Sequence, residues 1–261
     1  NKWGYIDTTG KEIIPIIYSD AVSHKMDSLL FLSQNNKWAI FNHKGKQYSK
    51  FIYDEIYGTY KNFDYHNSNY LFKGLLLVRK GNQYRYLNRD LEIVVDFGYY
   101  SKAEPITQFG YASVKKGSFY GVIDSMNNVV VPFEYSLIEH PRMAYQGFYD
   151  EFYIHKNGNV GILNEKAKLI ADIIYDSFER DYAKINDSSQ VIFIAKKNNH
   201  YGIIDKSGEI SLPIEFEKIL LFKGNNISIA KKNGFFGIID SDGNIKLPFD
   251  YQNITTYNDC N

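Results

Sequence analysis

The sequence predicts an all-β protein built from seven tandem copies of one short repeat. Three observations support this prediction. The chain of 261 residues contains 23 Tyr and 18 Phe, residue types that favour strands. One frame of aromatic, glycine, aspartate and proline positions recurs along the whole chain. Turn-forming Asn-Gly and Asp-x-x-Gly sequences separate short apolar runs.

The repeat frame is clearest in residues 200–219 and 235–254, which align without a gap. It reads aromatic, Gly, aliphatic, Ile, Asp, two variable positions, Gly, then Pro five positions later and an aromatic three positions after that. We number the copies 1 to 7 by their first, or lead, residues: Trp3, Trp38, Tyr84, Tyr120, Val160, Tyr201 and Phe236. The later aromatic position is assigned to Tyr18, Tyr53, Tyr99, Tyr135, Tyr175, Phe216 and Tyr251.

Each repeat is expected to contain three strands. An apolar run such as 191–194 forms the first strand, and a polar turn such as 232–234 leads into the second. The second strand is the run that follows the lead aromatic, and it ends in a turn whose Asp side chain bonds the backbone ahead. The third strand runs to the proline, which marks a strand end or a sheet edge because it cannot donate a ladder hydrogen bond.

Both faces of each small sheet are expected to be apolar and covered. Neighbouring aliphatics such as Ile203 and Ile204 point to opposite faces of a strand, and stacking one repeat on the next buries both. The lead and later aromatics should therefore be buried. Repeats 3 and 5 carry Leu91 and Ala167 at the turn glycine position, so we expect local distortion there.

The chain is expected to form a single array over residues 1–261. An open superhelical solenoid and a closed seven-bladed β-propeller would both bury the two faces. A propeller blade needs four strands, for which about 35 residues leave little room, and a solenoid needs no ring closure. We therefore expect the solenoid, with the propeller as the alternative. The approximate units are 1–24, 25–57, 70–104, 109–140, 150–179, 189–220 and 225–257.

Composition and motifs do not support a catalytic, metal or cofactor site, so we expect no enzyme. The 30 basic and 30 acidic side chains cancel, and Cys260 is the single cysteine, which excludes internal disulfides and cysteine-based metal motifs. The six histidines have no ligand spacing. Asp240 begins a sequence like a calcium loop, but the later ligands do not follow, which favours a turn-capping role. No apolar run is long enough for membrane insertion of this segment.

A row of basic pairs is the first candidate binding surface. In repeats 3 to 7 the fifth and fourth residues before the lead residue are basic, and stacking would align them. Such a row could hold a polyanion, or it could protect strand ends and aid solubility, and the zero net charge favours the second reading. We call the set the basic ridge: Arg79-Lys80, Lys115-Lys116, His155-Lys156, Lys196-Lys197 and Lys231-Lys232.

Two long connections are the second candidate surface. They follow repeats 2 and 4 and are rich in aromatic residues, which suits a protein interface on the loops of a rigid array. The alternative is that these side chains fold back onto the local core. The candidate partner-binding residues are Tyr60, Phe63, Tyr65, Arg142, Tyr145, Phe148 and Tyr149.

The segment 2–10, with Pro15 and Tyr18 following it, resembles the bacterial WG-repeat family, which is named for a Trp-Gly pair such as Trp3-Gly4. The resemblance extends over residues 2–254, although Trp is retained only at Trp3 and Trp38. It implies an array of β-hairpin units in a bacterial protein that acts as an interaction module. We therefore expect a non-enzymatic scaffold that binds another protein, with a carbohydrate or polyanion as the alternative partner. A leader upstream of this segment would place it at the cell surface or in the periplasm.

Overall fold

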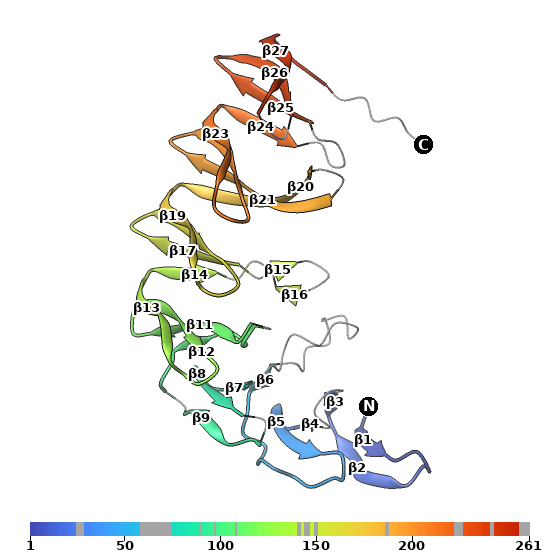
Figure 1. Cartoon of the computed structure of the whole chain (residues 1–261). Coiled ribbons are helices and arrows are strands. Elements are labelled where there is room, and N and C mark those ends of the chain that lie inside the picture. The colour runs from blue at the N-terminus through green and yellow to red at the C-terminus, as the bar shows by residue number, and fades with distance from the viewer. Residues whose placement is uncertain are drawn as a thin grey trace. The chain divides into compact units, whose positions relative to one another are not determined.

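The computed structural model contains β-strands and no helix in the residues that it describes (Figure 1). Consequently, no helix capable of crossing a membrane is found in this part of the chain. The described residues are 1–24, 29–57, 75–88, 90–96, 98–107, 109–139, 142–143, 147–148, 151–185, 188–221, 227–240 and 243–255.

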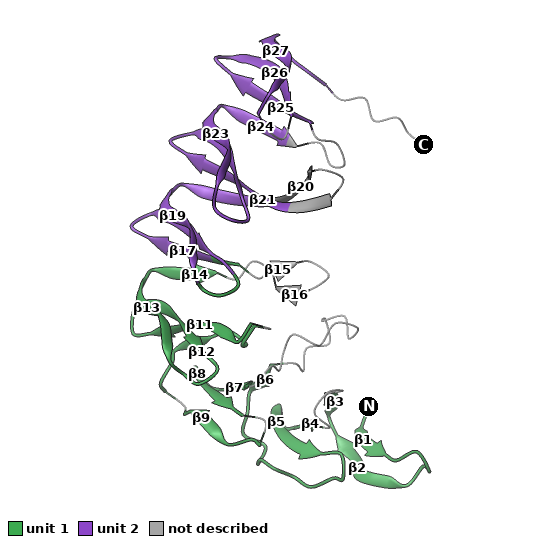
Figure 2. Ribbon diagram, in the orientation of Figure 1, with its two compact units in different colours: residues 1–152, 165–167 green, residues 153–164, 168–261 purple. Residues whose placement is uncertain are grey.

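The chain divides into two compact units, coloured in Figure 2, and the boundary falls within repeat 5. Unit 1 comprises residues 1–152 and 165–167, and unit 2 comprises residues 153–164 and 168–261.

The strands of unit 1 follow the order of the repeats. Repeat 1 contains β1 (Trp3–Ile6) and β2 (Glu12–Tyr18), and repeat 2 contains β3 (Asp20–His24), β4 (Leu29–Gln34) and β5 (Lys37–Asn42). Repeat 3 contains β6 (Glu55–Ile56), β7 (Leu76–Lys80), β8 (Gln83–Leu87) and β9 (Ile93–Val95). Repeat 4 contains β10 (Lys102–Ala103), β11 (Tyr111–Lys116), β12 (Phe119–Asp124) and β13 (Val129–Tyr135), and it is followed by β14 (Leu137–Glu139), β15 (Arg142–Met143) and β16 (Gly147–Phe148).

The strands of unit 2 continue the same pattern. Repeat 5 contains β17 (Phe152–Lys156), β18 (Asn159–Leu163) and β19 (Leu169–Tyr175). Repeat 6 contains β20 (Ser177–Ile185), β21 (Ser188–Lys197), β22 (His200–Asp205) and β23 (Ile210–Phe216). Repeat 7 contains β24 (Lys218–Leu221), β25 (Ile227–Lys232), β26 (Phe235–Asp240) and β27 (Ile245–Tyr251).

Repeats 3 to 7 each form a four-stranded sheet, one strand more than expected, and in repeat 5 the first strand is β14. The additional strand is the first in each sheet and begins two or three residues after the later aromatic of the preceding repeat. In repeat 7, for example, β24 follows Phe216 and pairs with β25. About 35 residues suffice because the hairpin turns are very short, as at Asn233-Gly234 between β25 and β26. Strand count therefore does not favour a solenoid over a propeller, and the open superhelix stays a prediction.

The core lies between consecutive sheets, which confirms the predicted stacking within each unit. One cluster joins Ile14 and Tyr18 of repeat 1 to Leu32 and Phe41 of repeat 2. Equivalent clusters join repeats 2 and 3, repeats 3 and 4, repeats 5 and 6, and repeats 6 and 7. Each sheet thus removes apolar surface from water by contacting its neighbour, and this burial is the main stabilising contribution to such arrays.

A bulge in the edge strand explains the glycine after the lead residue. In repeat 6, Tyr201 pairs with Phe216 and Ile203 pairs with Leu212. An advance of two residues along β22 is therefore matched by four residues along β23, which forms the bulge. The extra residues fold over Gly202, where an added Cβ would lie 2.6 Å from the Leu212 carbonyl oxygen. The proline position falls inside this bulged strand and not at its end, although the strand is an edge strand as expected.

The two repeats without this glycine lack the full edge strand. The five glycine-containing repeats have edge strands of seven residues, namely β2, β13, β19, β23 and β27. Repeat 3, with Arg85 at the glycine position, retains only the three-residue strand β9. Repeat 2, with Ala39 there, retains only two isolated bridges, Trp38 to Tyr53 and Phe41 to Gln47. The continuous edge strand thus occurs only in repeats with glycine at this position, although the two bridges of repeat 2 keep the register of Tyr201 with Phe216 and Ile204 with Ile210 in repeat 6.

The turns of repeats 3 and 5 are not distorted, contrary to our expectation. Leu91 and Ala167 adopt positive φ values of 63° and 57°, in the left-handed region used by the turn glycines. The Leu91 amide still donates to the Asn88 carbonyl at 2.9 Å. The turn geometry is therefore retained at the conformational cost of a side chain in this region, about 1 kcal/mol.

Three aromatic positions are exposed where burial was predicted, and the lead residues Trp38, Tyr84, Tyr201 and Phe236 are only partly buried. In repeat 3 the buried ring is Tyr100, which is 1% exposed, and not Tyr99, which is 48% exposed. Tyr251 in repeat 7 and Trp3 in repeat 1 are 42% and 45% exposed, so the expectation of burial was wrong for both. The other later aromatics are buried because a neighbouring sheet covers them, for example Tyr175 in the cluster between repeats 5 and 6.

Candidate functional site

The Asp or Asn at the end of the second strand caps a turn. In repeat 6, Asp205 Oδ1 accepts hydrogen bonds from the amides of Ser207 at 2.8 Å and Glu209 at 2.9 Å. Asn42 makes the equivalent bonds in repeat 2. The Thr9 hydroxyl, together with backbone amides, holds the pKa of Asp7 below its ordinary value. Capping thus accounts for this position, and no cluster of three or more potential metal ligands occurs in the described residues.

The basic ridge lies at the ends of β7, β11, β17, β21 and β25, immediately before each hairpin turn. In repeat 6 its two lysines contact two different rings. Lys196 Nζ lies 5.6 Å from the ring centroid of the lead residue Tyr201, and Lys197 Nζ lies 6.0 Å from that of Tyr175 in the preceding repeat. The corresponding pairs are Lys115 with Tyr120, Lys231 with Phe236 and Lys232 with Phe216, whereas Lys116 lies over Tyr99, the residue before the buried Tyr100. The second lysine therefore links consecutive repeats through a cation–π contact.

Carboxylates neutralise part of the ridge. Lys231 lies 3.4 Å from Glu217, and Lys232 lies 2.8 Å from Glu215. Arg79 Nε donates to Glu55 at 2.8 Å. The Gly234 amide and then Lys231 lower the pKa of Glu217. In repeats 3 and 7 the ridge thus has internal anionic partners, which supports the structural interpretation of this feature.

The candidate partner-binding connections lie mostly outside the described residues. This applies to Tyr60, Phe63, Tyr65, Tyr145 and Tyr149. Arg142 and Phe148 lie on β15 and β16, which form a two-stranded hairpin in which these two positions are paired. Their role in binding stays a prediction.

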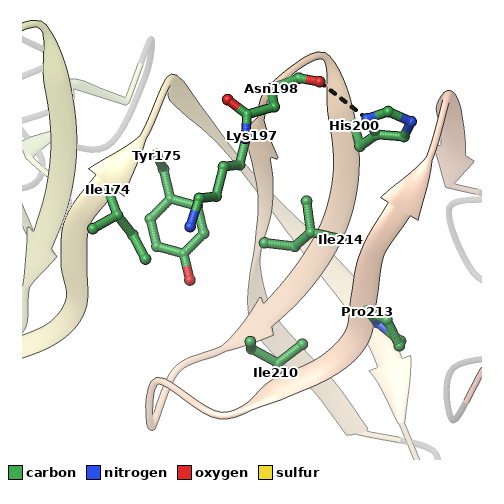
Figure 3. A pocket seen from close by; sticks show the side chains of 8 residues that line it. All are labelled: Ile174, Tyr175, Lys197, Asn198, His200, Ile210, Pro213 and Ile214. Carbon is green, nitrogen blue, oxygen red and sulfur yellow. Dashed lines mark hydrogen bonds between the residues drawn. The ribbon is translucent and has the colours of Figure 1, made fainter.

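An apolar groove between repeats 5 and 6 was not found from the sequence. It has a volume of about 480 Å³ and lies entirely within unit 2 (Figure 3). Its walls come from two edge strands and from the hairpin between β21 and β22. The lining residues are Ile174, Tyr175, Lys197, Asn198, His200, Ile210, Pro213 and Ile214.

A row of exposed aliphatic side chains runs along the edge strands and was also missed. Each member lies two residues after the turn glycine position, and the exposed fractions range from 51% to 61%. An isolated exposed aliphatic is ordinary, but recurrence at one position in five repeats is not. The signal was present in the sequence as a branched residue at this position in repeats 3 to 7. We call the set the aliphatic row: Ile93, Val129, Leu169, Ile210 and Ile245.

The solved structures that resemble this chain share little sequence identity with it. The chain matches Kluyveromyces lactis Hsv2 with 7% identity and a TM-score of 0.34, covering 86% of this chain and 73% of that one. It matches a structure described as the eukaryotic initiation factor with 10% identity and a TM-score of 0.38, covering 89% and 66%. It matches PorZ of Porphyromonas gingivalis with 9% identity and a TM-score of 0.30, covering 90% of this chain and 38% of that one. No curated protein matches the sequence.

The family comparison agrees with the repeat frame. The model of the WG containing repeat matches residues 3–38, 120–142, 201–234 and 236–259. Each matched region begins at a lead residue of the frame, those of repeats 1, 4, 6 and 7. Of the repeats between them, repeats 3 and 5 have the same strand order and repeat 2 lacks the edge strand, and all three keep the backbone hydrogen bond across the turn. These four matches support the assignment of the repeat frame to the WG-repeat family.

Proposed function

We propose that this protein is a non-enzymatic repeat scaffold that binds another protein along its edge strands. The aliphatic row is the observation that supports the proposal. Its side chains are more than half exposed and recur at one position, so a single partner could contact several repeats of a unit in the same way. A contact of this kind gains free energy by removing apolar area from water in each repeat.

The edge strands themselves do not suit addition of a further strand by a partner. The bulge interrupts the regular spacing of their backbone groups, and Pro132, Pro213 and Pro248 lack an amide donor. Recognition would therefore depend on the side chains of the aliphatic row rather than on backbone pairing. This arrangement permits binding while it protects the array against edge-to-edge aggregation.

The proposal is tested by displaying fragments of the source genome and selecting those that bind the protein. One variant replaces three members of the row: Leu169→Ser, Ile210→Ser and Ile245→Ser. A matched control replaces three exposed apolar residues elsewhere: Ile6→Ser, Met126→Ser and Leu220→Ser. We expect the row variant to lose the fragments enriched by the wild type and the control to retain them. Equal retention by both variants would refute the proposal.

A further inference from the structure

The residue before the later aromatic contacts the basic ridge of the next repeat. In repeat 6 this residue is Glu215, whose Oε1 accepts a hydrogen bond from Lys232 Nζ at 2.8 Å. In repeat 3 it is Tyr99, whose hydroxyl oxygen lies 3.3 Å from Lys116 Nζ. Both side chains place an oxygen within hydrogen-bond distance of the Nζ of the second lysine in the following basic pair. The position therefore supplies a polar partner for that lysine.

Repeat 5 has Ile174 at this position and supplies no such oxygen. Lys197, the second lysine of the next pair, is half-buried and keeps its contact with the Tyr175 ring. Figure 3 shows its side chain lying over this ring beside Ile174. Among the residues that the structure describes, no carboxylate lies within ion-pair distance of Lys197 Nζ. The groove opens at this point, bordered by the lysine and by an apolar wall.

We infer that this groove binds a carboxylate flanked by aliphatic side chains, on an extended peptide segment of the partner protein. The pairing of Glu215 with Lys232 is an internal template for the contact, because it shows a carboxylate on the equivalent lysine one repeat later. The ligand carboxylate would take this place on Lys197, and its neighbouring aliphatic side chains would cover Ile174 and Ile214. The half-buried position of the lysine strengthens such a pair relative to one in bulk water.

The choice of a peptide rests on the proposed function and on continuity with the aliphatic row. Ile210 belongs both to the row and to the groove. A segment seated on Lys197 can therefore continue along the edge strands, which a small acid cannot do. The inference adds a charge requirement at one groove to the general apolar contact proposed above.

The test uses a random dodecapeptide library displayed on phage and two reciprocal variants of the whole chain. Ile174→Glu introduces the carboxylate that repeat 6 already has, so that Lys197 acquires an internal partner. Glu215→Ile removes the carboxylate from Lys232 and should open a second groove between repeats 6 and 7. Lys197→Gln removes the charge without changing the apolar wall, and melting curves of all variants report whether the fold is retained.

We expect the wild type to enrich peptides in which Asp or Glu adjoins a branched aliphatic residue. Ile174→Glu and Lys197→Gln should each lower the affinity for these peptides at least about tenfold. Glu215→Ile should raise the stoichiometry from one bound peptide per chain to two. Enriched peptides without an acid, or equal binding to Ile174→Glu, would overturn the inference. Absence of any enrichment would also overturn it, whereas the proposed function is judged separately by the variants of the aliphatic row.

Discussion

Gly202→Ala is the sharpest test of the link between the repeat glycine and the bulged edge strand. The glycine does not have a positive φ, so alanine is disfavoured there by lack of space alone. The new Cβ would lie 2.6 Å from the Leu212 carbonyl oxygen and 2.7 Å from Ile214 Cγ1. Because the oxygen belongs to the backbone, β23 must move away from β22 to accommodate it.

The expected loss is about 2–4 kcal/mol in the free energy of unfolding. Overpacking by one methyl group costs about 1–3 kcal/mol, and each backbone hydrogen bond weakened by the shift adds about 1 kcal/mol. Urea denaturation followed by circular dichroism measures the total. Hydrogen exchange of residues 210–216 shows whether the edge strand is the part that opens.

Ala39→Gly is the matched control, because repeat 2 already accommodates a Cβ at this position and has no regular edge strand. It should cost only about 0.5–1 kcal/mol, the usual penalty for glycine in a strand. A loss below about 0.5 kcal/mol for Gly202→Ala, or unchanged exchange over residues 210–216, would refute the steric explanation of the glycine.

Four further outcomes are expected. Tyr175→Ala should lower stability by about 3–5 kcal/mol and Tyr251→Ala by clearly less, because only the first ring is buried; equal melting shifts would contradict this. Ala167→Gly should stabilise the fold by about 0.5–1 kcal/mol, measured by urea denaturation, because its φ is positive. Replacing the basic pairs of repeats 4 and 6 by Gln should lower the melting temperature, because each cation–π contact contributes about 0.5 kcal/mol. Retention of the wild-type protein on heparin at about 150 mM salt would contradict a purely structural role of the ridge. Asp205→Asn should reduce the acid sensitivity of melting between pH 7 and pH 3.

The sign of the pH effect follows from the hydrogen bonds of the turn. Burial alone would raise the pKa of Asp205, but the bonds from Ser207 and Glu209 outweigh it and leave the pKa below its ordinary value of 3.8. The cap therefore stabilises the fold fully above that ordinary value, and the contribution is lost as the pH falls through the lowered pKa. Asn keeps the accepting oxygen, as Asn42 does in repeat 2, without this titration.

Which arrangement the repeats adopt beyond each unit is a separate prediction. An open superhelix should give a radius of gyration well above the value of about 18 Å expected for a compact chain of this length, and small-angle scattering measures it. A radius near the compact value would instead favour the closed propeller.

The candidate site was predictable only in part. The basic ridge was found because its residues recur at a fixed offset from the lead aromatic, and the structure places Lys196 and Lys231 at the same point of their sheets. The groove beside Lys197 was not found, because it arises from the absence of an acid at Ile174, in a different repeat. The missing acidic partner of Lys197 can be recognised only when the strands that carry the two positions are known to be neighbours.

The sequence by itself determined the features that depend on a few consecutive residues. These include the number of repeats, the strands that follow each lead residue, and the turns capped by residues such as Asp205, because hairpin and turn geometry depends on local backbone preferences. Only the tertiary structure decided which sheet receives the strand after each later aromatic, where the edge strand bulges over Gly202, and whether Tyr99 or Tyr100 is buried. These features depend on register and on contacts between segments far apart in the chain, and a shift of one residue exchanges the buried and exposed faces of a strand.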